Sequence, residues 1–293
     1  MEPERSVFSV LRSTFTPAVM AILNVTPDSF SDGGVHFDRN VAVDAALRFE
    51  ADGATIVDIG GESTRPGSEA VSIDEELARV IPVIEEIRKR SEVRISIDTR
   101  KARVAEAALD AGADIVNDVS ALRHDPEMRV LVAKRRVPAI LMHMRGEPRT
   151  MQDNPRYDEV VSDVARELTV WCEEAIAAGI DASQLLVDPG IGFGKTFDHN
   201  LELLARCDEL TRIAPVVIGA SRKAFIGHLT GQPGGAPRMA GALATVAAAH
   251  RGGAAIVRVH DVRETIDFLK VLNAIEQKVP EARGLKPARG ARP

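Results

Sequence analysis

The sequence has few aromatic residues and no excess of positive charge, and both shortages argue against a nucleic-acid-binding protein. Aromatic residues make up 4% of the 293 residues, with one tryptophan and one tyrosine. That supply is poor for the stacking platforms on which single-stranded nucleic acids bind. The formal net charge is −6, whereas dedicated nucleic-acid binders are usually basic. We therefore expect no nucleic-acid partner.

Cysteines and long hydrophobic runs are also scarce. The two cysteines, Cys172 and Cys207, stand at no metal-ligand spacing and read as free thiols of a reducing compartment. No apolar run approaches the ~20 residues that span a bilayer, and no signal-peptide pattern opens the chain. These features predict a soluble, globular, cytoplasmic protein with no membrane partner.

The length is compatible with one domain or two. A rough ~150 residues per domain would suggest two, but an α/β barrel runs to ~250 residues as one. Residues 1–16 read as an N-terminal lead-in. Residues 278–293 carry three prolines, two glycines and five Lys/Arg, and we expect a disordered basic tail there. This leaves 17–277 as the folded body.

One pattern recurs through the body: a short apolar run, a loop containing Gly or Asp, and an amphipathic helical stretch. The runs are almost continuously hydrophobic, as in parallel strands that are covered on both faces. The expected strands are Val19–Leu23, Thr55–Ile59, Val93–Ile97, Asp114–Val116, Pro138–Met142, Leu185–Val187, Val216–Gly219 and Ile256–Val259.

Helical stretches alternate with these runs, which is the signature of βαβ units. The expected helices are about Val41–Ala51, Glu75–Arg90, Arg103–Ala111, Pro126–Arg135, Tyr157–Ala178, Asn200–Ile213, Arg238–His250 and Val262–Gln277. Eight such units with no break in composition predict a single-domain α/β protein, a (β/α)8 TIM barrel.

Polar residues follow every predicted strand. In a barrel of this kind the active site lies at the carboxyl ends of the strands, so these side chains should meet at one rim. A single polar residue there is often only a cap, but eight of eight strands predict a polar cup. The residues are Asn24, Asp58 with Glu62, Asp98, Asn117 with Asp118, His143, Asp188, Ser221 with Lys223, and Arg258 with His260.

The cup divides into an acidic half and a basic half. Asp98, Asn117 and Asp188 suit a ligand with several N–H donors, such as the guanidine-like edge of a heterocycle. Each aspartate has an alternative role as a helix cap, and Asp98 could instead pair with Arg100.

The basic half contains Arg65, Arg222, Lys223, Arg258 and His260. Loops after strands seven and eight form the usual phosphate site of barrels, so a phosphorylated or pyrophosphorylated substrate is expected. Asn24, on the neighbouring first strand, could hold a divalent cation that bridges a pyrophosphate.

Two polar, glycine-containing loops, 26–38 and 60–71, are long enough to be lids over this face. Phe30, Arg65 and Pro66 are their candidate ligand contacts, and ordinary surface connections are the alternative.

Some motifs only look functional. Gly194-Lys195-Thr196 ends like a phosphate-binding loop, but Pro189 stands where the first glycine belongs. Histidine spacing gives no support for zinc, and His143 is expected to be a packing or hydrogen-bonding group.

The motifs taken together resemble those of bacterial dihydropteroate synthases. The resemblance runs from about residue 18 to 276, with one motif in each barrel unit. It is carried by the segments 22–34 (ILNVTPDSFSDGG), 58–67 (DIGGESTRPG), 96–99 (SIDT), 117–120 (NDVS), 141–144 (LMHM), 188–195 (DPGIGFGK), 221–223 (SRK) and 258–261 (RVHD).

The resemblance implies roles for matching residues. The pterin would be held by Asp98, Asn117, Met142, Asp188, Phe193 and Lys223, and the pyrophosphate by Asn24, Thr64, Arg258 and His260, with Mg²⁺ on Asn24. Phe30, Arg65, Pro66, Lys223 and Ala224 would contact 4-aminobenzoate. Family members often have serine where this chain has Ala224, so one hydroxyl contact to the benzoate is missing.

The implied reaction is a transfer in folate biosynthesis. The enzyme would join 6-hydroxymethyl-7,8-dihydropterin diphosphate to 4-aminobenzoate, giving 7,8-dihydropteroate and pyrophosphate, with Asp98, Asp188 and Lys223 as the catalytic residues. The resemblance also implies a homodimer that is a target of sulfonamides. A pterin-binding methyltransferase barrel and a catalytically silent pterin-binding paralogue are the alternatives.

Overall fold

The computed structural model describes residues 17–26, 39–63, 68, 70–147 and 149–278. The lead-in at 1–16 lies outside these residues, as does all of the tail except Lys278. Within the described part of the chain, no helix is long and apolar enough to cross a membrane.

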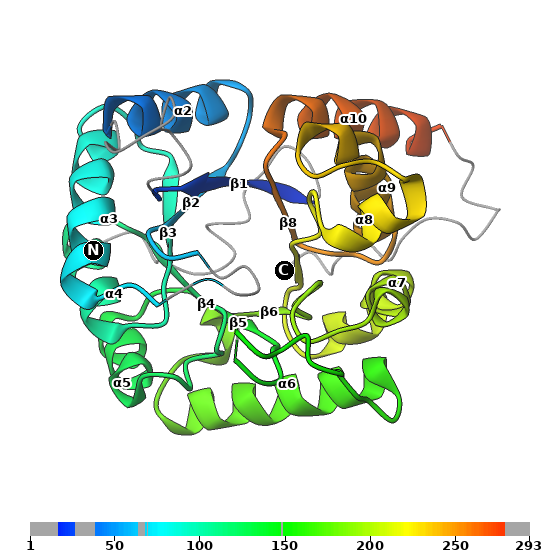
Figure 1. Ribbon diagram of the computed structural model, residues 1–293. Helices are drawn as coiled ribbons and strands as arrows, with labels where there is room; N and C mark the ends of the chain where they lie inside the picture. Colours follow the sequence, from blue (N-terminus) through cyan, green and yellow to red (C-terminus); the bar gives the residue numbers. More distant parts are fainter. Residues whose placement is uncertain (1–16, 27–38, 64–67, 69, 148, 279–293) are drawn as a thin grey trace.

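Eight parallel strands form the centre of the molecule, and helices surround them (Figure 1). The strands are β1 (Ala18–Asn24), β2 (Ile56–Gly60), β3 (Arg94–Asp98), β4 (Ile115–Asp118), β5 (Ala139–Met142), β6 (Leu185–Asp188), β7 (Val217–Ile218) and β8 (Ile256–Val259). β1 to β6 pair in parallel with their neighbours in the chain, and β8 pairs in parallel with both β7 and β1. An isolated parallel bridge between Val187 and Val216 connects β6 to β7, so the (β/α)8 TIM barrel is nearly closed.

The helices follow the strands in alternation, as expected. They are α2 (Arg39–Ala51), α3 (Ile73–Arg88), α4 (Ala102–Asp110), α5 (Pro126–Arg135), α6 (Val160–Ala177), α7 (Phe197–Ala205), α8 (Ala224–Thr230), α9 (Met239–Arg251) and α10 (Val262–Glu276). α3 shows why these segments are helical. Ser72 caps its first turn by accepting from the Glu75 N–H at 3.2 Å, and Val80, Val83 and Ile87 recur on its buried face.

Two helical segments differ from the sequence expectation. The helix expected over 200–213 ends at Ala205, because the backbone of Arg206 leaves the helical region and Cys207–Arg212 continues as a 3₁₀ helix. This break buries the Cys207 side chain against Gly252, where a Cβ atom would lie 2.0 Å from the sulfur. The short helix α8 directly after Lys223 was not expected from the pattern.

The barrel interior is filled by an apolar layer that is separate from the core under the helices. It consists of Ala18, Met20, Ile56, Ile115, Ile140, Leu186, Val217 and Ile256. Side chains alternate along a strand, so the residue two positions further on also faces the interior, one layer nearer the carboxyl ends. On β2, β4, β5, β6 and β8 these residues are Asp58, Asn117, Met142, Asp188 and Arg258, in that order. The floor of the barrel is therefore apolar and its mouth is mostly polar.

Candidate active site

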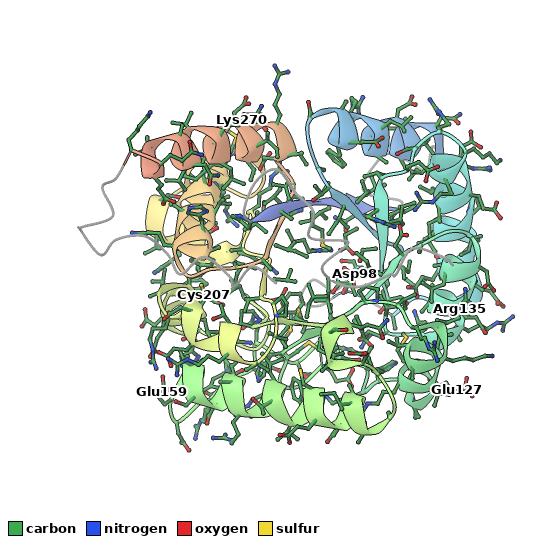
Figure 2. All side chains as sticks on the ribbon, turned by 180° about the vertical axis from the view of Figure 1, so that it is seen from behind. Asp98, Glu127, Arg135, Glu159, Cys207 and Lys270 are labelled. Atoms are coloured by element: carbon green, nitrogen blue, oxygen red, sulfur yellow. The ribbon has the colours of Figure 1, made fainter. Side chains whose placement is uncertain are left out.

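Arg258, on β8, lies between two carboxylates at the mouth of the barrel. Its Nε donates to Oδ2 of Asp58 at 2.6 Å, and its Nη2 donates to Oδ2 of Asp98 at 2.7 Å. Asn117 donates from Nδ2 to the same Asp58 oxygen at 3.1 Å. Four strands thus contribute to one network, and Figure 2 shows Asp98 near the centre of the ring of helices.

Asp58 was expected at the rim of the cup, but the sequence assigned it no binding or catalytic role. The sequence places it at a strand end without a role, although it follows Ile56 by two positions and shares the inward orientation of Asn117 and Asp188. The side chain is fully buried, and its Oδ1 has no hydrogen-bond partner in the structure. Counting alternate positions from Ile56 in the apolar floor indicates that Asp58 points into the cup.

The acidic half has two aspartates at the barrel mouth, of which Asp188 is buried and Asp98 is partly buried. Burial raises the pKa of Asp98 to about 7 although the charge of Arg258 opposes it, and the nearby Asp58 raises it further. Burial also raises the pKa of Asp188, whose Oδ1 accepts from the Gly190 N–H at 2.7 Å. Neither residue caps the next helix: Lys101 precedes α4, and Thr196 caps α7.

Lys223 and Phe193 form the wall of the cup next to Asp188. The Lys223 ammonium lies 4.1 Å from the centre of the Phe193 ring, a cation–π contact. Phe193 packs against a small buried cluster of Val119, Met142, Met144 and Met151. The structure thus brings Met142 and Phe193 together as an apolar surface beside the charged groups.

The segment after β7 is held by a second ion pair. The Arg222 guanidinium donates from Nε to Oδ2 of Asp261 at 3.0 Å, and Arg222 has a left-handed backbone with φ of +59°. His260 interacts with the Ser221 hydroxyl through Nδ1 at 3.0 Å. Burial, followed by the charges of Arg222 and Arg258, lowers the pKa of His260 to about 3, so the imidazole is neutral near pH 7.

Among the described residues, several others that the sequence suggested for the site take no part in the network around Arg258. Arg100 binds Glu62 at 2.7 Å, so it is not the partner of Asp98. Asp118 accepts from Ser120 and Leu122 within its own turn. Asn24 is half-buried and in register with Gly60, and Ala224 is exposed at the start of α8. Phe30, Thr64, Arg65 and Pro66 lie outside the described residues.

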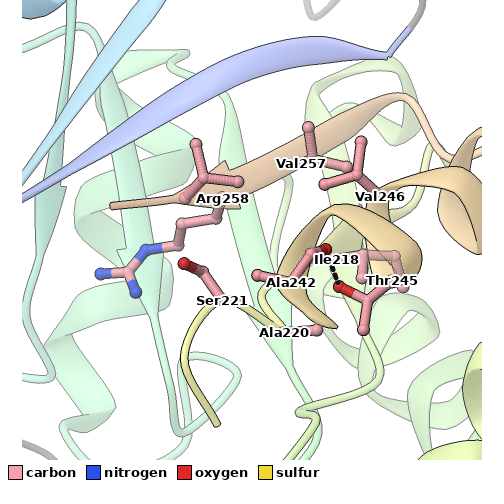
Figure 3. A pocket seen from close by; sticks show the side chains of 9 residues that line it. Ile218, Ala220, Ser221, Ala242, Thr245, Val246, Val257 and Arg258 are labelled. Atoms are coloured by element: carbon pink, nitrogen blue, oxygen red, sulfur yellow. Dashed lines mark hydrogen bonds between the residues drawn. The ribbon is translucent and has the colours of Figure 1, made fainter. Parts of the chain in front are cut away.

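A small cavity lies on the helix side of β7 and β8, against α9. Its lining includes Ile218, Val246 and Val257 (Figure 3). A volume of about 10 Å³ is close to the space that one water occupies, so this cavity cannot hold a heterocycle. Figure 3 shows the Arg258 guanidinium extending away from the α9 side chains.

Comparison with known proteins gives the family. Residues 20–260 match the model of the pterin binding enzymes. The chain belongs to the pterin-binding enzyme family. A family relative, the dihydropteroate synthase of Escherichia coli K12, is 48% identical over 262 residues, which cover 88% of this chain and 91% of the relative.

Solved structures of relatives have the same fold at similar identity. Dihydropteroate synthase of Xanthomonas albilineans with 4-aminobenzoic acid is 48% identical with a TM-score of 0.84, covering 92% of this chain and 95% of that one. The same enzyme in complex with 7,8-dihydropteroate is 45% identical with a TM-score of 0.81, covering 92% and 96%. Within the family, the chain groups with the dihydropteroate synthases.

The raised pKa of Asp98 gives a testable pH dependence of stability. The folded state holds the Asp98 proton up to about pH 7, whereas an unfolded aspartate releases it near its ordinary value of 3.8. The contribution of this group to stability is therefore full below pH 3.8 and is lost as pH rises towards 7. We expect Asp98→Asn to gain stability relative to the wild type as pH rises from about 4 to about 8.

Urea unfolding at a series of pH values measures this difference. Asp267→Asn, at an exposed position on α10, is the control and should show a constant difference from the wild type. A constant difference for Asp98→Asn as well would mean that Asp98 has an ordinary pKa.

Proposed function

We propose that the protein is a dihydropteroate synthase that joins 6-hydroxymethyl-7,8-dihydropterin diphosphate to 4-aminobenzoate, releasing pyrophosphate. The observation that carries the proposal is the set of polar groups at the barrel mouth: buried Asn117 and Asp188 and partly buried Asp98, beside Lys223. Relatives of this name match nearly the whole chain. One of them has been solved with 4-aminobenzoic acid and with 7,8-dihydropteroate.

The pterin ring is proposed to lie in the acidic half of the cup. Its amino and ring N–H groups would donate to Asp188 and Asp98, and Asn117 would supply an amide. Lys223 would donate to the acceptor atoms of the ring, while Met142 and Phe193 cover its face. Burial strengthens each of these hydrogen bonds, because little water competes for the carboxylates.

The chemical step is proposed to be dissociative. The bond from the pterin methylene to the pyrophosphate oxygen breaks first, and the amine nitrogen of 4-aminobenzoate then bonds to the methylene and loses a proton. An aryl amine is already unprotonated near pH 7, so no general base is needed. Asp98 and Asp188 stabilise the electron-poor pterin, and Arg258 and His260 stabilise the departing anion.

The oxygen donors proposed for the metal site at Asn24 are of the kind that Mg²⁺ prefers. Asn24 would offer one amide oxygen, and a bound pyrophosphate and water would supply the other oxygens. The described residues contain no group of three or more His, Cys, Asp or Glu side chains that could hold a metal ion by themselves. When bound, the ion would neutralise part of the charge of the leaving group.

The 4-aminobenzoate is proposed to bind at the outer side of the cup, next to the pterin. Phe30, Arg65 and Pro66 are proposed to close over the substrates, and Thr64 to contact the pyrophosphate. Ala224 would offer a backbone N–H to the benzoate carboxylate. Sulfonamides, which carry a similar aryl amine, are proposed to compete for that place. We propose a cytoplasmic homodimer.

The experiment is a coupled assay of pyrophosphate release, run with and without 4-aminobenzoate. We expect release that depends strictly on the amine. Methyl transfer to a cobalamin protein would instead identify a methyltransferase. Binding of the pterin without any release would identify a silent paralogue.

A further inference from the structure

Lys195 is a buried lysine beside the cup to which the proposed reaction gives no role. Its residue is 2% exposed. The ammonium donates to the carbonyl of Phe193 at 3.0 Å, to the carbonyl of His143 at 3.3 Å, and to Nδ1 of the His143 ring at 3.1 Å. An ammonium has three N–H donors, so every donor has an acceptor.

These contacts connect two segments that flank the proposed pterin-binding position. His143 directly follows Met142 at the end of β5, and Phe193 belongs to the loop after β6. We propose that Lys195 is a positioning residue of the pterin site, whose ammonium holds Phe193 and the end of β5 in register. This inference rests on the proposed function in so far as it concerns the pterin.

Burial lowers the pKa of Lys195 to about 7, and the surrounding hydrogen bonds favour its ammonium form. Since an ammonium only donates, Nδ1 of His143 accepts, and its Nε2–H donates to Oε2 of Glu167 at 3.0 Å. Arg145 donates from Nε to the other Glu167 oxygen at 3.0 Å. Burial and the Lys195 charge lower the pKa of His143 to about 4, so the ring is neutral. A neutral imidazole thus links a buried cation to a carboxylate.

The loop after β6 packs so closely against the end of β5 that two of its positions have no room for a side chain. Gly190 has φ of +68°, and a Cβ atom there would lie 2.0 Å from the His143 carbonyl oxygen. At Gly194 a Cβ would lie 2.8 Å from the Arg145 carbonyl oxygen. The Lys195 ammonium bonds this loop to the end of β5, while Gln152 and Tyr157, from the segment after β5, donate to the loop carbonyls of Gly192 and Gly194.

The position of this loop sets the wall of the cup. Phe193 lies under the Lys223 ammonium, and a Cβ on Gly192 would lie 3.0 Å from Cδ of Lys223. If the ammonium of Lys195 is removed, the Phe193 carbonyl loses its partner and the loop can shift away from β5. Phe193 then no longer lies where the pterin needs it.

The test is Lys195→Met, which keeps most of the apolar stem and removes the ammonium. We expect the Kd of 6-hydroxymethylpterin, measured by calorimetry well below the melting temperature, to rise about tenfold or more, because small displacements in a site cost such factors. The Michaelis constant for the aminobenzoate substrate, measured at saturating pterin, should stay within about twofold. Lys270→Met, an exposed lysine on α10, is the matched control and should change neither constant.

A lower melting temperature with an unchanged pterin Kd would overturn the inference, because a purely structural lysine gives that result. If Lys195→Met does not fold, Lys195→Arg replaces it: the wider guanidinium cannot sit between the same three acceptors, and the same selective rise is expected. A wild-type protein that binds pterin without releasing pyrophosphate contradicts the proposed function alone. The pterin Kd still tests Lys195 in that case.

Discussion

Asp188→Ala is expected to lower kcat/KM for the pterin substrate by about 10²- to 10⁴-fold. Asp188 is 6% exposed at the end of β6, and it is the proposed acceptor of two pterin N–H groups. Hydrogen bonds to a charged group contribute about 1.5–3 kcal/mol each, which gives this range for two of them. The variant also leaves Lys223 and Arg258 with one compensating charge fewer.

Pyrophosphate release in the coupled assay measures the effect. Asp198→Ala, at an exposed position in the first turn of α7, is the control and should keep nearly full activity. Near-normal pyrophosphate release by Asp188→Ala would contradict the dissociative model, because that model needs the carboxylate to stabilise the electron-poor pterin.

Asp58→Ala is expected to lower the free energy of unfolding by about 3–5 kcal/mol. Asp58 is fully buried and binds both Arg258 and Asn117. Removing one partner of a buried ion pair costs about this much, and Arg258 would keep only its bond to the Asp98 carboxylate. For a chain of this size the melting temperature should fall by about 10 °C. Turnover should fall as well, because Arg258 and Asn117 both lose the carboxylate to which they donate.

Urea unfolding and thermal melting measure the change, and the surface pair of Arg135 and Asp110 provides the comparison. Asp110→Ala breaks a bond of 2.6 Å at an exposed site and should cost no more than about 1 kcal/mol. Equal losses in the two variants would show that the network around Arg258 is not a buried anchor.

The barrel was predictable because its strands and helices carry local signals. Apolar runs covered on both faces predicted eight strands in the right order, and the polar residues after them predicted the rim. The short helix α8 stands outside the repeating strand–helix pattern, and the 3₁₀ segment Cys207–Arg212 depends on packing between distant segments. Gly252, which lies against Cys207, is an example.

The site was predictable as a set of residues but not as a set of contacts. From the sequence, Arg258 is expected in a basic half, apart from the carboxylates. In the structure it binds Asp58 and Asp98, which lie 200 and 160 positions away in the chain. Such pairs follow from barrel closure and from the inward orientation of alternate residues. The same alternation turns His143 away from the cup, where it packs on the Trp171 ring at 5.2 Å.

The most direct test of the central claim is to identify the product. The purified protein is incubated with 6-hydroxymethyl-7,8-dihydropterin diphosphate, Mg²⁺ and 4-aminobenzoate that carries a heavy nitrogen isotope, and the products are analysed by mass spectrometry. We expect 7,8-dihydropteroate that contains the heavy nitrogen, in amounts equal to the pyrophosphate released. Pyrophosphate release accompanied only by the hydrolysed pterin alcohol, or no product at all, would contradict the proposed function.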